Sequence, residues 1–222
     1  MYPHCEAPSH DELDITDFSA VQDFIQHSKP DLLIHCAAMT GVVDCENNKE
    51  KAYAVNVTGT RNLLESCFRF SPEVYFVYIS TPCIFSGFEG NYHEDSVPYP
   101  QNFYGLTKLL GECEVKNSRL KKWLIIRSNF VPRKPWPYPR AFVDRYGTYL
   151  FADTLAKRIR EVVEDNILGV IHICGNKRLS MYELAKMTTP TIMPMTLDDY
   201  VGPHLTRDMT LISKRLQAFE FE

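Results

Sequence analysis

The sequence predicts an α/β protein with a parallel sheet and helices on both faces of that sheet. Short apolar runs with the β-branched and aromatic composition of buried strands occur at residues 32–34, 74–79, 123–126 and 170–173. Segments with helical periodicity lie between these runs. This alternation of strand and helix is typical of parallel strands joined by crossover helices.

The composition excludes several functional classes. With 45% hydrophobic and 23% charged residues among 222, the chain has the composition of an ordinary globular protein. Its net charge of −4 argues against nucleic acid as a partner. No uncharged apolar stretch reaches the roughly 18 residues of a membrane span, and no signal peptide precedes the first predicted helix. We therefore expect neither nucleic acid nor a membrane among its partners.

The cysteines predict a reducing environment. There are seven of them, an odd number without the spacing of a disulfide framework. Free thiols of this kind are typical of the cytoplasm, which is the location we expect. No group of Cys and His has metal-ligand spacing, so no metal site is predicted.

Asp17 predicts the start of the first helix. Its carboxylate can cap a segment whose apolar stripe is formed by Phe18, Val21 and Ile25. Pro30 follows and prevents the helix from continuing.

The strand at residues 32–34 runs into the small residues Ala37 and Ala38, which suit either strand packing or close approach of a ligand. A long helix is predicted between residues 44 and 68 from its apolar positions Ala52, Val55, Gly59 and Leu63. Asn56 lies amid this apolar face. A buried asparagine must find hydrogen bonds, so a purely structural role is one interpretation.

The second predicted strand ends at Ser80 and Thr81, because a proline follows. Asn102 can then cap a helix on which Tyr104 and Lys108, four residues apart, share one face. A cation beside a phenol lowers the pKa of that phenol. Such a tyrosine can donate a proton to a carbonyl oxygen.

A second tyrosine–lysine pair with the same spacing, Tyr182 and Lys186, is interpreted as structural. Ser180 and Glu183 form a capping box at the start of its helix, and no strand end bearing hydroxyl groups comes shortly before it.

Prolines alternate with basic and aromatic residues between positions 132 and 140, so no regular helix is expected there. Arg133, Lys134 and Trp136 could pair with phosphate and stack on a base in a nucleotide diphosphate. A solvated linker is the alternative. Beyond this loop, the pattern predicts helices at 155–163 and 210–216.

Four segments carry a family resemblance: residues 13–17 (LDITD), 30–38 (PDLLIHCAA) followed by Asp44, 79–85 (ISTPCIF) and 103–108 (FYGLTK). They resemble the extended short-chain dehydrogenase/reductase family. Within it, they are similar to reductases of 4-keto-6-deoxy sugar nucleotides, such as dTDP-4-dehydrorhamnose reductases and the epimerase/reductases of UDP-rhamnose formation. The resemblance implies a Rossmann-like fold, with a partial dinucleotide-binding domain at 1–127 and a substrate-binding region at 128–222.

The resemblance also implies an activity in deoxysugar or rhamnose biosynthesis. A nicotinamide cofactor, NADPH or NADH, would reduce the C4 ketone of a nucleotide-diphosphate sugar while Tyr104 supplies the proton. Lys108 would lower the pKa of Tyr104 and hold the cofactor ribose. Thr81, with Ser80, would hydrogen-bond the carbonyl oxygen. The implied cofactor-binding residues are Asp14, Ala37, Ala38, Asn56, Ser80, Tyr104 and Lys108.

The role of Asp14 has an alternative, and one substrate-binding residue is added by a loose match. Asp14 could contact adenine, as an acidic residue of the family does, or it could share a capping role with Asp17. Arg207 matches, loosely, an arginine that relatives place near the substrate.

Cys83 follows Thr81 and Pro82, where many rhamnose-forming reductases have Asp-Tyr. Relatives that combine C3/C5 epimerisation with reduction tend to have a cysteine here. A thiol beside an enolisable carbon could exchange a proton, which would make Cys83 catalytic. Simple packing at a strand end is the alternative.

The first 40 residues contain no glycine, so the glycine turn that cradles a dinucleotide pyrophosphate is absent from this sequence. We expect a family member that lacks its first βαβ unit, with weak cofactor binding and reduced activity. The strand at residues 32–37 would then be an unprotected sheet edge, which favours self-association into a homo-oligomer. The competing hypothesis is a non-catalytic regulatory subunit, similar to the methionine adenosyltransferase beta subunit.

Overall fold

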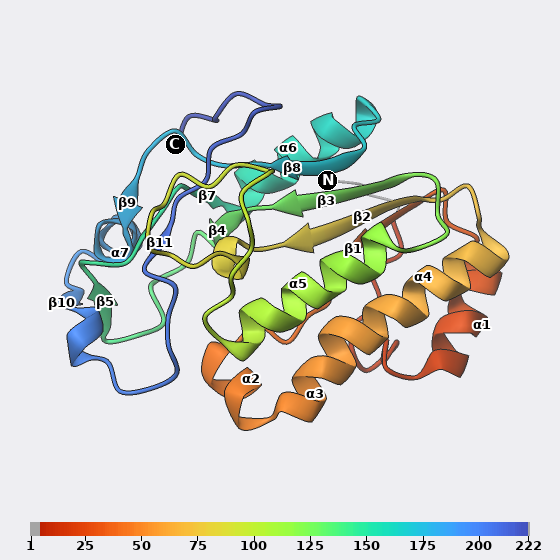
Figure 1. The fold of residues 1–222 in the computed structure, drawn as a ribbon, viewed down its shortest axis with the longest axis horizontal. Helices are drawn as coiled ribbons and strands as arrows, with labels where there is room; N and C mark the ends of the chain where they lie inside the picture. The colour runs from red at the N-terminus through yellow and green to blue at the C-terminus, as the bar shows by residue number, and fades with distance from the viewer. Residues whose placement is uncertain (1–4, 222) are drawn as a thin grey trace.

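The main sheet has four parallel strands in the order β1-β2-β3-β8 (Figure 1). The structure, a computed structural model, describes residues 5–221. The strands are β1 (Leu32–His35), β2 (Tyr75–Ser80), β3 (Trp123–Arg127) and β8 (Gly169–His172). Each coincides with an apolar run in the sequence, and the predicted α/β class with a Rossmann-like parallel sheet is confirmed.

Both faces of the sheet are buried, because alternate residues of β2 enter two separate cores. Phe76 and Tyr78 pack on one face with α1 (Phe18–Ser28), α4 (Gly59–Phe70) and α5 (Phe103–Lys116). Tyr75 and Val77 pack on the other face with α6 (Ala152–Glu164). A strand that is buried on both sides must be apolar throughout, which explains its uninterrupted hydrophobic composition.

Three predicted helix starts are confirmed by their caps. The side chains of Asp17 and Asn102 accept hydrogen bonds from backbone N–H groups at the starts of α1 and α5. Ser180 and Glu183 form the predicted capping box of α7 (Met181–Thr188). Each cap satisfies donors that a helix start otherwise leaves unpaired.

The single long helix predicted from 44 to 68 is wrong. The segment is divided into α2 (Val42–Asn47), α3 (Lys49–Tyr53), a π-helical turn η1 (Ala54–Thr58) and α4. Asn48 ends α2 and caps α3 through a side-chain bond from Lys51 N. The π turn widens the helix at Asn56, a feature that often marks functional sites.

Short strand pairs lie beyond the carboxyl ends of the main-sheet strands (Figure 1). They were not predicted, since two or three residues carry no detectable periodicity. β4 (Asn129–Val131) pairs with β7 (Tyr149–Phe151), and β5 (Arg140–Phe142) pairs with β10 (Met193–Met195). β6 (Tyr146–Gly147) lies between β9 (Leu179–Ser180) and β11 (Asp208–Met209). Two 3-10 turns, η2 (Pro82–Ile84) and η3 (Leu197–Asp199), complete the elements.

The helix predicted at 210–216 is wrong, because tertiary hydrogen bonds hold this segment extended. The carbonyl of Thr210 accepts from Tyr92 N at 3.0 Å, and Ile212 N donates to Tyr92 O at 2.9 Å. Leu211 N donates to Thr148 Oγ1 at 2.9 Å. These bonds satisfy backbone groups that a helix would have paired internally. Within residues 5–221, no helix combines the length and the hydropathy needed to cross a bilayer.

Candidate functional site

Tyr104 and Thr81 meet where the start of α5 packs against the end of β2. Asn102 Oδ1 accepts from Gly105 N at 2.9 Å and begins α5 one residue before Tyr104. A Cβ on Gly105 would lie 2.3 Å from the carbonyl oxygen of Cys83, so only glycine permits this approach. The phenol of Tyr104 lies close enough to the Thr81 side chain for that side chain to influence its pKa. The predicted pair of hydroxyls is therefore brought together.

Burial sets the acidity of Tyr104. Desolvation raises its pKa well above the ordinary value, and nearby Cys83 adds to this effect. The Thr81 side chain acts in the opposite direction but is the smaller influence. The expected net lowering of the Tyr104 pKa is therefore wrong for the protein by itself, because loss of solvent opposes formation of the phenolate more strongly than the neighbouring groups favour it.

Lys108 is an ammonium group held in the interior, with only 3% of the residue exposed. Its Nζ lies 4.0 Å from the centroid of the Tyr78 ring, and burial lowers its pKa to about 7, although Glu112 and Cys36 act to raise it. Its Nζ forms no hydrogen bond with residues 5–221, although its carbonyl accepts one from Tyr78 OH at 3.5 Å. A buried ammonium with unsatisfied donors fits a ligand that offers hydroxyl oxygens, such as the ribose of a dinucleotide.

Asn56 connects the loop after β1 to the helix that carries Lys108. Its Oδ1 accepts from Met39 N at 2.8 Å, and its Nδ2 donates to Met39 O at 3.0 Å and to Thr107 Oγ1 at 2.8 Å. Thr107 directly precedes Lys108. The side chain that the sequence singled out is thus fully hydrogen-bonded and supports the neighbourhood of Lys108 through Thr107.

The other predicted cofactor-binding residues are placed differently. Ala37 is exposed and Ala38 half-buried at the carboxyl end of β1, where a ligand can reach them. The predicted role of Ser80 beside Thr81 is corrected, because its hydroxyl is buried and donates to Glu112 at 2.6 Å. Asp14 is exposed, and its carboxylate accepts from the backbone and side chain of Thr16 at 2.9 and 2.8 Å. These bonds lower the pKa of Asp14.

Cys83 lies in the same apolar cluster as Tyr104. Only 7% of the residue is exposed, and its thiol donates to Met209 Sδ at 3.6 Å. Tyr149 packs in this cluster as well. The structure therefore brings Cys83 next to the proton donor that the sequence predicted.

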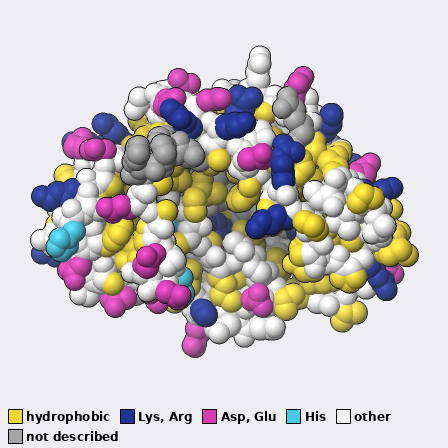
Figure 2. All heavy atoms as spheres, turned by 180° about the vertical axis from the view of Figure 1, so that it is seen from behind, with side chains coloured by type: hydrophobic (Ala, Val, Ile, Leu, Met, Phe, Trp, Pro, Cys, Tyr) yellow, Lys and Arg dark blue, Asp and Glu magenta, His cyan; other side chains and the backbone are white. Residues whose placement is uncertain are grey.

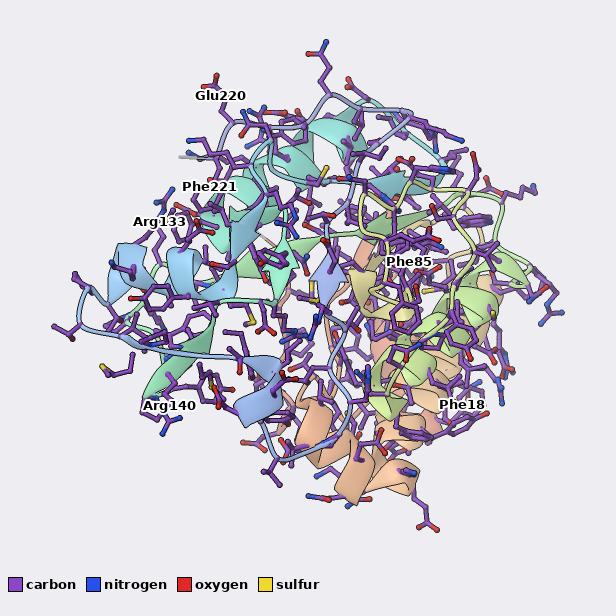
Figure 3. All side chains as sticks on the ribbon, turned by 60° about the vertical axis from the view of Figure 1, so that its left-hand side comes forward. Phe18, Phe85, Arg133, Arg140, Glu220 and Phe221 are labelled. Carbon is purple, nitrogen blue, oxygen red and sulfur yellow. The ribbon has the colours of Figure 1, made fainter. Side chains whose placement is uncertain are left out.

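Of the predicted substrate-binding residues, Arg133, Lys134 and Arg207 are exposed, whereas Trp136 is partly buried and packs against the apolar cluster that Cys83 and Tyr104 also contact. Arg133 pairs with Asp153, Nε to Oδ2 at 3.0 Å, and its guanidinium lies 4.0 Å from the ring centroid of Phe151. Phe151 stacks on Phe221, so Arg133 and Phe221 lie on the same side of the molecule, as Figure 3 shows. Lys134 is exposed.

Trp136 and Arg207 also have protein partners. The indole N–H of Trp136 donates to Arg140 O at 3.2 Å, and its ring packs beside Tyr182. Arg207 pairs with Asp144 at 3.5 Å. Of these two residues, Trp136 also packs against the apolar cluster that Tyr104 contacts.

Figure 2 shows the molecule from behind, where its surface is hollowed near the middle. Hydrophobic side chains line this hollow, and Lys or Arg side chains lie beside it. Apolar walls with a few cations suit a phosphorylated ligand that carries an apolar ring. Among the described residues, no group of His, Cys, Asp or Glu is arranged to hold a metal ion.

Sequence reasoning missed the groups that surround Lys108. Tyr78 lies beneath its ammonium, and the Lys108 charge partly opposes the rise that burial causes in the Cys36 pKa. Strand periodicity places Tyr78 on the same face as Ser80, two residues later, and could have identified it. The buried carboxylate Glu112, one turn after Lys108, was also missed.

Comparison with known proteins gives a family match over more than half of the chain. The model of the RmlD substrate binding domain matches residues 3–136. A probable low-salt glycan biosynthesis reductase, Agl14 of Haloferax volcanii, is 38% identical over 133 residues, which are 58% of this chain and 43% of that protein. The bovine methionine adenosyltransferase 2 subunit beta is 25% identical over 240 residues, covering 95% of this chain and 71% of its own.

Solved structures agree with the fold. The crystal structure of a hypothetical dTDP-4-dehydrorhamnose reductase from Sulfolobus tokodaii has a TM-score of 0.81 and 33% identity, covering 97% of this chain and 83% of that one. A dTDP-4-dehydrorhamnose reductase from Bacillus anthracis, in complex with NADP, has a TM-score of 0.87 at 24% identity, with 96% and 85% covered. The chain thus spans less than half of the archaeal reductase Agl14 but most of these two solved chains.

Proposed function

The chain belongs to the RmlD substrate binding domain family, and from that membership we propose that it takes part in reducing a 4-keto-6-deoxy sugar nucleotide with NADPH or NADH. The observation that carries the proposal is that Tyr104 lies beside Thr81 at the carboxyl end of β2, with the buried Lys108 one turn further along α5. Ligands of open parallel sheets bind at this edge. The solved relative with NADP supports the choice of cofactor.

When bound, the nicotinamide supplies a hydride to the sugar carbon. The residues of the chain supply the proton and orient the substrate. Tyr104 keeps its proton at neutral pH because burial raises its pKa, so the phenol is available as the acid. It donates that proton to the C4 oxygen, and the Thr81 hydroxyl, which lies beside the phenol, orients the same oxygen.

Lys108 has two roles in this proposal. Its unsatisfied donors hold the hydroxyls of the cofactor ribose, while its charge stabilises the phenolate that remains on Tyr104. Asn56, through Thr107, keeps Lys108 in place. Ala37 and Ala38 admit the cofactor next to β1, and Asp14 lies on the surface where an adenosine could be contacted.

The substrate is proposed to be a nucleotide-diphosphate sugar. Arg133, Lys134, Trp136 and Arg207 would bind its nucleotide portion. The exposed guanidiniums would exchange their surface partners, Asp153 and Asp144, for phosphate oxygens. Exposed ion pairs contribute only about 0–1 kcal/mol, so such an exchange costs little.

The substitution Tyr104→Phe tests the proposal. We expect it to abolish reduction of dTDP-4-dehydrorhamnose, measured by oxidation of NADPH, while circular dichroism shows an unchanged fold. Tyr182→Phe is the matched control, because Tyr182 has the same spacing to a lysine but packs against Ala185 and Ile192. Equal loss of activity in both variants would contradict the assignment.

Cys83 is proposed to exchange protons at C3 or C5, because it is buried beside Tyr104 in one cluster. Cys83→Ser should stop deuterium uptake from solvent at these carbons while it spares reduction of an already epimerised substrate. Mass spectrometry of the recovered sugar measures the uptake. No exchange with the unmodified protein would show that Cys83 only packs.

A regulatory subunit is the second candidate, favoured by the bovine relative that aligns with nearly the whole chain. That candidate predicts no turnover in either the unmodified protein or Tyr104→Phe. It also predicts that the chain binds a methionine adenosyltransferase catalytic subunit, which a pull-down with the purified subunit measures.

A further inference from the structure

Glu112 is the most deeply buried carboxylate beside the candidate site. It is 0% exposed and lies on α5 one turn after Lys108. Its Oε1 accepts from Ser80 Oγ at 2.6 Å and from Arg127 Nε at 2.9 Å, while Oε2 accepts from Arg127 Nη2 at 2.7 Å. The pair with Arg127 is therefore bidentate, which fixes its geometry as well as its charge.

Arg127 anchors this carboxylate from the opposite side. It is 2% exposed and stands at the end of β3. Its Nη1 donates to Glu94 O at 3.2 Å, and its guanidinium lies 5.3 Å from the ring centroid of Phe85, which is labelled in Figure 3. Lys116 Nζ, at 3.5 Å from Oε2, is a second cation paired with Glu112.

A buried ion pair is weak evidence of net stability, because desolvation of both charges offsets their attraction. The hydrogen bonds of this pair nevertheless fix the relative position of three elements, because α5, β2 and β3 all contribute a side chain to the contact with the Glu112 carboxylate. Ser80 immediately precedes Thr81, and Glu112 repeats the spacing of Tyr104 and Lys108 along one face of α5.

We infer that Glu112 is a positioning residue, which holds the face of α5 carrying Tyr104 and Lys108 in register with the end of β2 that carries Thr81. It touches neither substrate nor cofactor and acts through Lys108. This inference rests on the proposed function for its catalytic consequence, but its effect on Lys108 is measurable without any substrate.

The groups that face Lys108 come from three elements. Tyr78 of β2 lies beneath it, His35 at the end of β1 and Cys36 directly after that strand are close to it, and Glu112 follows it on α5. Burial lowers the pKa of Lys108 to about 7, and Glu112 is the larger of the two influences that oppose this. Loss of the carboxylate charge should therefore lower the pKa of Lys108 further and leave it mostly neutral at pH 7.

The test compares substitutions that separate charge from shape. Glu112→Gln removes the charge and keeps the hydrogen bond from Ser80. Glu112→Asp keeps the charge and shortens the side chain. Glu112→Gln leaves the buried charge of Arg127 without its ion-pair partner and could unfold the protein. The double variant Glu112→Met/Arg127→Met removes both charges at similar volume and serves as the second test. Glu114→Gln, which breaks the surface pair with Arg61 on the same helix, is the control.

Two readouts decide the outcome in the full chain. Carbon-13 NMR of the Lys108 ε-methylene gives its titration midpoint, and the pH profile of kcat/KM gives the alkaline limb of activity. We expect Glu112→Gln and the double variant to move both to lower pH and to reduce kcat at pH 7 at least tenfold. Glu112→Asp should reduce kcat without moving the midpoint, and Glu114→Gln should change neither.

An unchanged Lys108 midpoint and kcat in folded Glu112→Gln or in the double variant would overturn the inference. If the unmodified protein reduces no sugar nucleotide, the proposed function fails, but the NMR midpoints still decide the role of Glu112. The two failures are therefore distinguishable.

Discussion

His35 and Lys108 carry charge states that their surroundings impose. His35 is buried at the end of β1, where its Nε2 contacts Thr60 Oγ1 at 2.9 Å. Burial, together with the charge of Lys108, lowers its pKa to about 3. The buried imidazole of His35 is therefore neutral at pH 7, beside the candidate site.

This environment predicts a specific loss of stability in acid. The folded-state pKa of His35 lies below its ordinary value of 6.5, so the unfolded chain binds more protons. The free energy of unfolding should therefore fall as pH drops below about 6.5, by about 2 kcal/mol between pH 7 and pH 5 from His35 alone. Urea unfolding at the two pH values measures this difference.

The matched pair for that experiment is His35→Gln and His10→Gln. His35→Gln should flatten the dependence on pH, because glutamine does not titrate. His10 is exposed, and its replacement should leave the dependence as it is. If both variants kept the full dependence, other groups would be responsible.

At the scale of elements, α5 is placed by its glycines as much as by its apolar side chains. A Cβ on Gly111 would lie 2.1 Å from Tyr78 OH and 3.0 Å from Asn56 O. α5 therefore packs closely on both β2 and the π turn η1. This proximity brings Lys108 over the Tyr78 ring and Thr107 to Asn56.

Gly111→Ala should destabilise the protein by about 1–3 kcal/mol, because the added methyl group overpacks a rigid contact. Helix propensity alone predicts the opposite sign, a gain of roughly 0.5–1 kcal/mol. The free energy of unfolding in urea thus decides between the two. Cys113→Ala, at an exposed position of the same helix, should change it by less than about 0.5 kcal/mol. A stabilised Gly111→Ala would mean that α5 can move away from β2.

At the scale of the whole molecule, the main sheet has an exposed edge at β1. Among residues 5–221, β1 is hydrogen-bonded to β2 and to no other strand. Its apolar residues Leu32, Leu33 and Ile34 are all partly exposed. An apolar edge without lysine or proline invites pairing with another chain.

We therefore expect this chain to self-associate through residues 32–37. Sedimentation velocity between one and about 50 micromolar, a range in which exposed strands associate, should show a sedimentation coefficient that rises with concentration. Hydrogen exchange should show protection of β1 amides that increases in parallel. A monomer across the whole range would mean that the edge is already covered.

The sequence by itself determined the four strands of the main sheet, the caps of α1, α5 and α7, and the face that unites Tyr104 with Lys108. These features depend on local patterns, namely apolar runs, capping side chains and helical spacing, which neighbours in the chain decide. The same local patterns predicted a continuous helix at 44–68 and a helix at 210–216, and both predictions are wrong. At 44–68 the Asn48 cap and the π turn interrupt the helix, and at 210–212 bonds to Tyr92 and Thr148 replace the helical hydrogen bonds.

Only the tertiary structure decided how charge is distributed in the candidate site. The spacing of Tyr104 and Lys108 predicts a lowered phenol pKa, yet burial raises it, since desolvation depends on every element packed around the group. The Ser80 hydroxyl likewise donates to Glu112 and does not act beside Thr81 and Tyr104. Only the packing of α5 on β2 shows this. Spacing along the chain determines which side chains share a face, while burial and distant partners determine what those side chains do there.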